Sequence, residues 1–217
     1  MIRNTGLIVL HSTRFGENST VLHTLSKEYG RRSFLVRGVG KKALTTLFLP
    51  LTILEADIIE NPKSNLYTAK NLSSVHSLIG IRSDIYKNSI SMFMAEVLFR
   101  VLKEGTYEEG LYQWCEHSIL LLDALESDFS NFPIRFLLEM AVVMGFSPSS
   151  ENMMPFAGNS FGLMNRFLTD SFSDSMLIPL SGEKRNELLS IVLKYLEYHI
   201  DSPININSLS VLRSIFA

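Results

Sequence analysis

The sequence contains a single cysteine, Cys115, among 217 residues. One thiol cannot form a disulfide within the chain, and it cannot supply the cysteine set of a structural zinc site. Cys115 shares a predicted helical face with Leu111, Ser118 and Leu122, and no lysine or arginine close to it in sequence would lower its pKa. We therefore interpret it as a buried structural thiol in a cytoplasmic protein.

Long hydrophobic runs are also missing from the sequence. The purely apolar stretches are a few residues long, such as 119–122, far below the roughly 18 residues that suggest a membrane-spanning helix. The five histidines are scattered, and none has the H-x-x-x-H or H-x-E spacing of a metal site. We expect no membrane span, no bound metal and no cofactor.

The segment 34–43 reads FLVRGVGKKA, and its glycines and lysines suggest a phosphate-binding loop. The nucleotide-binding pattern is G-x-x-x-x-G-K-[ST], with the last hydroxyl bound to magnesium. If Gly40 and Lys41 ended this pattern, a glycine would replace Leu35 and a hydroxyl residue would replace Lys42. Both positions depart from the pattern, so we expect contacts with phosphates but no nucleotide pocket.

The segment 158–162 reads GNSFG and matches G-x-S-x-G, the elbow that carries the nucleophile of many serine hydrolases. An acid, Asp170, and a histidine, His199, follow in the order of a triad. The elbow requires a buried parallel strand before the serine, and the preceding residues include Pro155 and have no strand pattern. We expect no enzyme, and we keep a serine hydrolase that uses Ser160 as an alternative.

Positive charge is concentrated in the first part of the chain. Residues 1–78 carry ten Lys and Arg against five Asp and Glu, whereas residues 79–217 carry ten against 17. A basic excess attracts polyanions, so we expect the first part to bind nucleic acid. A second alternative is a protein-interaction adaptor whose basic face binds an acidic partner. The candidate phosphate-binding residues are Arg14, Arg31, Arg32, Arg37, Lys41 and Lys42.

The hydrophobic period changes near residue 80. Before it, apolar residues alternate in short segments bounded by turn residues, which predicts five strands at 7–11, 20–25, 33–39, 49–59 and 65–72. After it, apolar residues recur every three or four positions, which predicts helices at 90–102, 111–125, 132–144, 183–200 and 207–216. The segment 147–180 has a weak pattern and predicts long loops with short helical or strand pieces. We expect an α+β protein, with an OB-like five-stranded barrel at 1–78 and an all-helical domain at 79–217.

The segment 9–42, VLHSTRFGENSTVLHTLSKEYGRRSFLVRGVGKK, resembles the N-terminal signature of the bacterial RecO family of DNA repair proteins. That signature is a strand, a basic residue, Gly-Glu, a second strand, Gly-Arg, a third strand that ends in Arg-Gly, and a basic loop. Here the basic residue is Arg14, and the third strand ends at Arg37 and Gly38. The segments 95–102 and 132–146 resemble two signatures of the family's helical domain.

The resemblance implies a recombination mediator that hydrolyses no nucleotide. Such a protein binds single- and double-stranded DNA, anneals complementary strands, and works with RecR to load RecA onto strands coated by single-stranded DNA-binding protein. The acidic, Phe-ended C-terminal tail of the coating protein would dock on the helical domain, where Arg100 and Arg135 match basic positions of the family. Many relatives carry a four-cysteine zinc knuckle after the helix that here ends at 145–146. This chain has no cysteine there, so we expect no zinc.

Overall fold

The computed structural model describes residues 2–38, 44–61, 64 and 66–216. The chain forms two compact units. The first unit comprises Met1–Ile79 and Ala95–Leu120, and the second unit comprises Gly80–Met94 and Leu121–Ala217. Over the described ranges, no helix has the length and hydropathy needed to cross a membrane.

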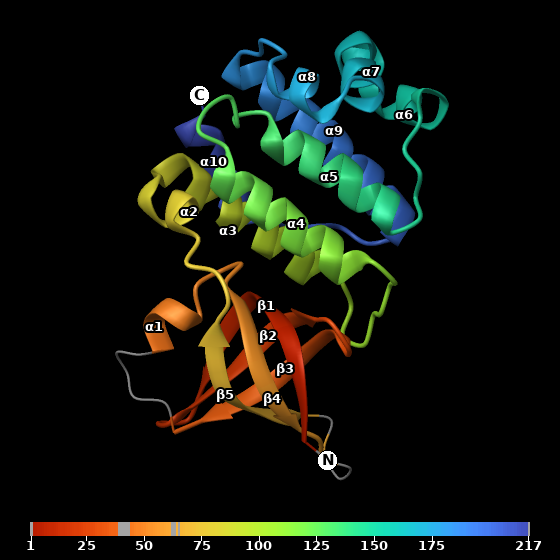
Figure 1. Ribbon diagram of the computed structural model, residues 1–217. Helices are drawn as coiled ribbons and strands as arrows, with labels where there is room; N and C mark the ends of the chain where they lie inside the picture. Colours follow the sequence, from red (N-terminus) through yellow and green to blue (C-terminus); the bar gives the residue numbers. More distant parts are fainter. Residues whose placement is uncertain (1, 39–43, 62–63, 65, 217) are drawn as a thin grey trace. The chain divides into compact units, whose positions relative to one another are not determined.

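Five strands of the first unit close into a barrel in the order β1-β2-β3-β5-β4 (Figure 1). Strands β3 and β5 pair in parallel, and the other four neighbouring pairs are antiparallel. The strands are β1 (Ile2–Phe15), β2 (Ser19–Ser26), β3 (Gly30–Arg37), β4 (Ile53–Ile59) and β5 (Tyr67–Ser74). The predicted OB-like barrel, followed by helices, is therefore confirmed.

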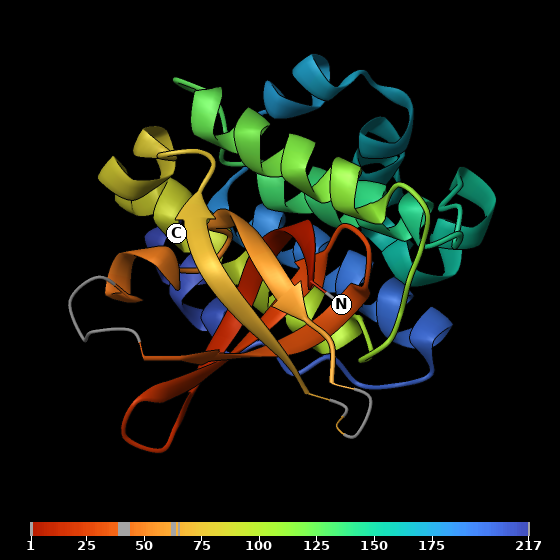
Figure 2. The same cartoon turned by 60° about the horizontal axis from the view of Figure 1, so that its bottom comes forward.

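Strand β1 is much longer than its apolar pattern predicted. Its first half pairs with β4, and its second half pairs with β2. Polar residues at both ends are held by these ladders, as in the pairs Asn4–Asp57 and Arg14–Thr20. The end of β1 and the start of β2 form a hairpin that projects from the rest of the barrel, which Figure 2 shows in red.

The barrel interior is filled by alternate residues of the strands. Phe34 is fully buried there, and Leu22 and Val36 lie beside it on the paired strands β2 and β3. Inward and outward positions therefore alternate along β3, so Leu35 and Arg37 face the outside of the barrel.

Helical residues of the first unit pack on the outside of β1, β2 and β3. The ring of Phe99, near the end of α3 (Ile85–Val101), lies 5.2 Å from the ring of His11 and 5.3 Å from that of His23. The backbone of Arg31 donates a 2.8 Å hydrogen bond to the carbonyl oxygen of Thr106. A Cβ on Gly6 would lie 2.5 Å from the hydroxyl oxygen of Tyr112, so a larger residue there would require the Tyr112 side chain to shift. These contacts make the segment 95–120 part of the barrel's packing.

The long helices agree with the sequence pattern to within a few residues. They are α3, α4 (Leu111–Ala124), α5 (Phe132–Val143), α9 (Gly182–Ile200) and α10 (Ser208–Ile215). Ser181 caps α9, because its side chain accepts a hydrogen bond from the backbone of Lys184. Cys115 is fully buried on α4, and burial raises the pKa of its thiol, as the structural reading predicted.

The segment 147–180 is mostly helical, so the prediction of long loops was wrong there. Its helices bury Met153, Met164 and Phe167, which supply a core that the weak periodicity did not reveal. The short helices of the chain are α1 (Leu44–Leu47), α2 (Ile79–Ser83), α6 (Ser150–Ala157), η1 (Gly158–Ser160), α7 (Phe161–Thr169) and α8 (Phe172–Met176).

Asn131 precedes α5, and its side chain makes no capping hydrogen bond. Its amide nitrogen instead donates to the carbonyl oxygens of Ser175, Met176 and Ile178. Its side-chain oxygen accepts a 3.2 Å hydrogen bond from Nε of Arg185. Because Asn131 is buried, these four bonds tie α8 and α9 to the start of α5.

Candidate nucleic-acid interface

Four outward-facing side chains form a row across four neighbouring strands of the barrel. Phe15 on β1 pairs with Ser19 on β2, which pairs with Arg37 on β3. The parallel strands β3 and β5 pair Leu35 with Thr68, so Arg37 and Lys70, each two residues further on, lie next to each other on the same face. We call Phe15, Ser19, Arg37 and Lys70 the outer row.

The positive charges of the outer row are exposed, and neither Arg37 nor Lys70 has an ion pair with another described residue. Asp57 pairs with Lys70 across β4 and β5, but its carboxylate is already engaged. Its two oxygens accept hydrogen bonds of 2.8 Å from Asn71 and 3.1 Å from Asn4, which lower the pKa of Asp57. Both donors are neutral amides, so Asp57 keeps its negative charge beside Lys70, while the donors of Arg37 and Lys70 remain available to an anionic ligand.

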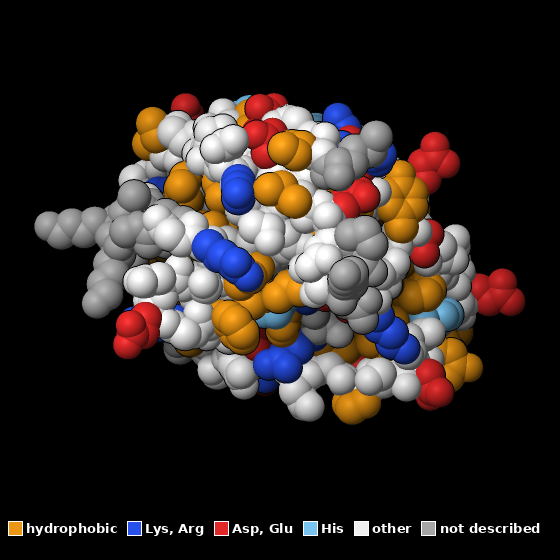
Figure 3. Space-filling view, turned by 90° about the horizontal axis from the view of Figure 1, so that it is seen from below, with side chains coloured by type: hydrophobic (Ala, Val, Ile, Leu, Met, Phe, Trp, Pro, Cys, Tyr) orange, Lys and Arg blue, Asp and Glu red, His pale blue; other side chains and the backbone are white. Residues whose placement is uncertain are grey.

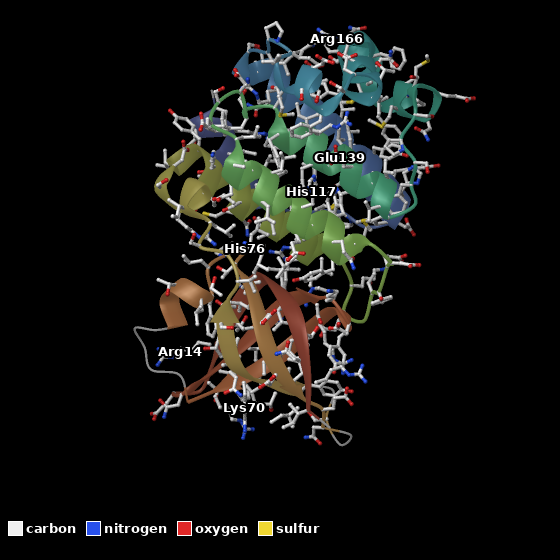
Figure 4. All side chains as sticks on the ribbon, viewed as in Figure 1. Arg14, Lys70, His76, His117, Glu139 and Arg166 are labelled. Carbon is white, nitrogen blue, oxygen red and sulfur yellow. The ribbon has the colours of Figure 1, made fainter. Side chains whose placement is uncertain are left out.

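Arg14 lies at the exposed end of β1, directly before Phe15, and the alternation of the strand puts it on the opposite face from Phe15. Figure 4 labels Arg14 and Lys70, and both side chains point outward from the barrel. Figure 3 shows Lys and Arg side chains spread between hydrophobic ones on the face of the molecule seen from below. Basic groups alternating with apolar ones suit a polymer that offers both phosphates and bases.

The two candidate lysines follow β3 in the sequence. The backbone of Gly38 donates a 3.0 Å hydrogen bond to the carbonyl oxygen of Asn18, which extends the pairing of β2 and β3 past Arg37. Lys41 and Lys42 lie outside the described residues. They follow Arg37 by four and five residues in the sequence.

Arg31 was predicted to contact phosphate, but the structure buries its side chain. Its side chain is 5% exposed, its Nη1 lies 3.1 Å from Oε2 of Glu104, and its guanidinium lies 5.0 Å from the ring centre of Phe99. Burial lowers the pKa of Arg31, and the carboxylate of Glu104 opposes that change. Arg31 therefore joins the barrel to the segment 95–120, where a phosphate has no access to it.

Arg32 was also predicted to contact phosphate, and it is half-buried in the structure. Its guanidinium lies 3.9 Å from the ring centre of Tyr67, which is close cation–π contact. The alternation along β3 explains both placements, because Arg31 faces the covered outside of the barrel and Arg32 faces the other way. The outer row and Arg14 are the better candidates for phosphate contacts.

His23 on β2 lies near the buried Arg31, on the outer face of the barrel that the segment 95–120 covers. Its Nδ1 is 2.8 Å from the hydroxyl oxygen of Ser33, and its ring stacks at 5.7 Å on that of His11. Burial, with the charges of Arg31 and His11, lowers the pKa of His23, and Glu104 only partly opposes this. The folded protein therefore favours neutral His23.

The two candidate partner-binding arginines belong to different units. Arg100 lies near the end of α3 in the first unit, where its side chain is 44% exposed and 3.8 Å from the carboxylate of Glu96. Arg135 lies in α5 of the second unit, and its Nε is 2.8 Å from Oε1 of Glu139. Nη1 of Arg135 also donates a 2.9 Å hydrogen bond to the carbonyl oxygen of Phe167.

Arg135 borders a small open pocket of about 80 Å³ on the second unit. The pocket has mostly apolar walls and one guanidinium, which is already paired with the carboxylate of Glu139 in the same lining. Such walls suit an apolar side chain, and a ligand carboxylate would share the guanidinium with Glu139. The other lining residues are Leu138, Glu139, Val142, Pro148, Phe167 and Leu168.

Ser160 does not stand on a nucleophile elbow. It ends a short 3-10 turn between α6 and α7, and the described residues before it form a helix and not a strand. Nζ of Lys184 donates a 2.7 Å hydrogen bond to its hydroxyl oxygen, and the hydroxyl hydrogen-bonds to the carboxylate of Glu187. Nζ of Lys184 also lies 2.7 Å from the carboxylate of Glu187, so the hydroxyl, the lysine and the carboxylate contact one another. This cluster fastens η1 to α9.

Lys70 and Phe15 were not among the candidates chosen from the sequence. Lys70 lies in the segment 65–72 that was predicted as a strand, but only the parallel pairing of β3 and β5 brings it beside Arg37. Nothing in the sequence next to Phe15 distinguishes it from the core residue Phe34.

Comparisons with known proteins match the whole chain. The family model described as recombination protein O N terminal matches residues 1–78, and that described as recombination protein O C terminal matches residues 82–152. A DNA repair protein RecO of Phocaeicola vulgatus is 31% identical over an alignment that covers all of both chains. A protein of the same name from Bacteroides fragilis is 28% identical with the same coverage. One from Porphyromonas gingivalis is 27% identical over 92% of this chain and 93% of its own.

Proposed function

The chain belongs to the RecO family of DNA repair and recombination proteins, and on that premise we propose that it is a recombination mediator that binds DNA through its barrel. The observation that carries this proposal is the outer row, in which Arg37 and Lys70 stand side by side without an ion pair to other described residues. Phosphates of single- or double-stranded DNA would neutralise these charges and Arg14, together with Lys41 and Lys42.

The mediator role requires no nucleotide, metal or other cofactor. We assign DNA binding to residues 1–78 and partner binding to residues 79–217, in a protein that acts in the cytoplasm. Because the segment 95–120 packs on the barrel, the DNA-binding part also needs Phe99, Glu104 and Tyr112 for its stability. The protein would anneal complementary strands and, with RecR, help to load RecA onto coated strands.

The pocket beside Arg135 is the proposed site for the tail of single-stranded DNA-binding protein. The guanidinium would pair with a carboxylate of the tail, and the apolar walls formed by Leu138, Val142 and Leu168 would receive its terminal Phe. Arg100 is the second proposed contact, because its side chain is well exposed and its pairing with Glu96 is long. Both contacts lie outside the outer row and would act separately from it.

A strand-annealing assay tests the mediator proposal directly. Two complementary oligonucleotides, one of them fluorescent, are coated with single-stranded DNA-binding protein and mixed with this protein without any nucleotide. We expect annealing with the intact coating protein and a much slower reaction when its C-terminal tail is deleted. No annealing of either coated or naked strands would refute the proposal.

The same protein preparation separates the two alternatives. An adaptor that binds only an acidic protein partner would show no salt-sensitive binding to DNA. A serine hydrolase would lose an ester-cleaving activity on Ser160→Ala, whereas the mediator would keep its annealing activity. We expect Ser160→Ala to anneal DNA normally, since its hydroxyl is engaged by Lys184 and Glu187.

A further inference from the structure

We propose that Phe15 stacks on an unpaired base and gives the barrel a preference for single-stranded over duplex DNA. This inference rests on the proposed function, because it concerns the same DNA-binding surface. It adds a residue that recognises bases to the residues that neutralise phosphates.

Phe15 is the aromatic side chain that the described part of the barrel leaves most open to solvent. It is 59% exposed, at the end of β1 in the projecting hairpin of Figure 2. Phe34 is fully buried in the core, and the rings of Tyr29 and Tyr67 pack edge-on at 6.0 Å from each other. The ring of Phe15 is therefore not needed to fill the core. A planar ligand that stacks on the ring would account for an aromatic residue at this position.

The position of Phe15 also places it in line with the charges. It lies two strands from Arg37 and three from Lys70 in the outer row, and neighbouring strands are about 4.8 Å apart. The backbones of Phe15 and Arg37 are thus roughly 10 Å apart. A single strand that crosses β1, β2, β3 and β5 could place one base on Phe15 and its neighbouring phosphates on Arg37 and Lys70.

The turn next to Phe15 constrains the path of the strand. Glu17 lies in this turn and is exposed, so its charge repels phosphates at the hairpin tip. The backbone of the DNA should therefore pass on the side of Arg37, which leaves the base to face Phe15. In a duplex the faces of the bases are covered by their neighbours, so only the phosphate contacts remain.

Three substitutions at Phe15 separate aromatic stacking from mere apolar contact. Phe15→Leu keeps an apolar side chain without a ring, Phe15→Ala removes both, and Phe15→Trp keeps a ring and adds a fluorescent reporter. Affinity is measured by fluorescence anisotropy for a single strand of about 20 thymidines and for a duplex of the same length, at one salt concentration. Because Phe15 is exposed, all three variants should fold, and their urea unfolding curves check this.

We expect Phe15→Leu and Phe15→Ala to weaken single-strand binding about 5- to 150-fold, the effect of losing one base–aromatic stack. Duplex binding should change by less than about twofold, since phosphates supply it. The added fluorescence of Phe15→Trp, measured against wild type, should be quenched by the single strand and not by the duplex.

Several results would overturn the inference while leaving the proposed function in place. Wild-type single-strand affinity in Phe15→Leu would show that no ring is needed. Equal losses for single strand and duplex would mean that Phe15 supports the hairpin and not a base. Loss of RecR binding with normal DNA binding would make Phe15 a protein contact. If the wild-type protein bound no DNA at all, the proposed function would fail together with this inference.

Discussion

Removing the two adjacent charges of the outer row should change the salt dependence of DNA binding by a calculable amount. The variant Arg37→Gln with Lys70→Gln keeps polar side chains of similar reach and removes both charges. Both residues are exposed and have no ion pair with described residues, so the substitution should cost little stability. The effect on binding can therefore be assigned to lost phosphate contacts.

The magnitude follows from counterion release. Each phosphate neutralised on a single strand contributes about 0.7 to the slope of log K against log salt. Four to five contacts, from Arg14, Arg37, Lys70 and the lysines of the following loop, give the wild type a slope of about −3. Losing two contacts should bring the slope to about −1.6 and lower the affinity about 25-fold at about 0.1 M salt.

Fluorescence anisotropy with a labelled single strand at several salt concentrations measures both quantities. The matched control is Lys27→Gln, which removes one exposed charge of the same barrel from the turn between β2 and β3, at the other end of these strands from Arg37. The control should change the affinity by less than about twofold, as expected for a charge outside the site. An unchanged slope in the double variant, or an equal loss per charge in the control, would refute the assignment of the outer row.

Three further predictions concern other parts of the molecule. Glu104→Gln should lower the free energy of unfolding by about 1–2 kcal/mol in a urea titration, because it removes the charged partner of buried Arg31 while Glu104 itself is half exposed. The pKa of His23 is lowered in the folded state, so the free energy of unfolding should fall as the pH drops below about 6.5. The variant His23→Gln should lose less stability over this pH range. Identical pH profiles for the variant and the wild type would contradict the prediction. Arg135→Ala should weaken binding of the coating protein's tail peptide about tenfold in isothermal calorimetry without changing DNA affinity; equal loss of both would indicate misfolding.

The strands could be predicted from the sequence because each carries its own signal. Alternating residues such as Leu7, Val9, Leu22 and Phe34 face one interior, and turn residues bound every strand. The helices were predictable for the same reason, except in 147–180. There, buried residues such as Met153 are contributed by short helices. These helices are too short for a hydrophobic period of 3.6 residues to be recognised in the sequence.

The site was less predictable, because its residues depend on contacts between distant parts of the chain. Nothing near Arg31 in sequence indicates that Glu104 and Phe99 will cover it. Lys70 reaches the site only through the parallel pairing of β3 with β5, which a local pattern does not encode. Charge composition indicated the part of the chain that holds the candidate site, and the register of the barrel selected among its basic residues.

The most direct test of the central claim is the salt dependence of wild-type binding to a single strand. Affinity for an oligonucleotide of about 20 thymidines is measured between about 50 and 300 mM salt. The proposed outer row, with Arg14 and the following lysines, predicts a linear log–log plot with a slope of about −3. A flat plot, or no binding at the lowest salt concentration, would contradict the claim that this barrel holds DNA by its phosphates.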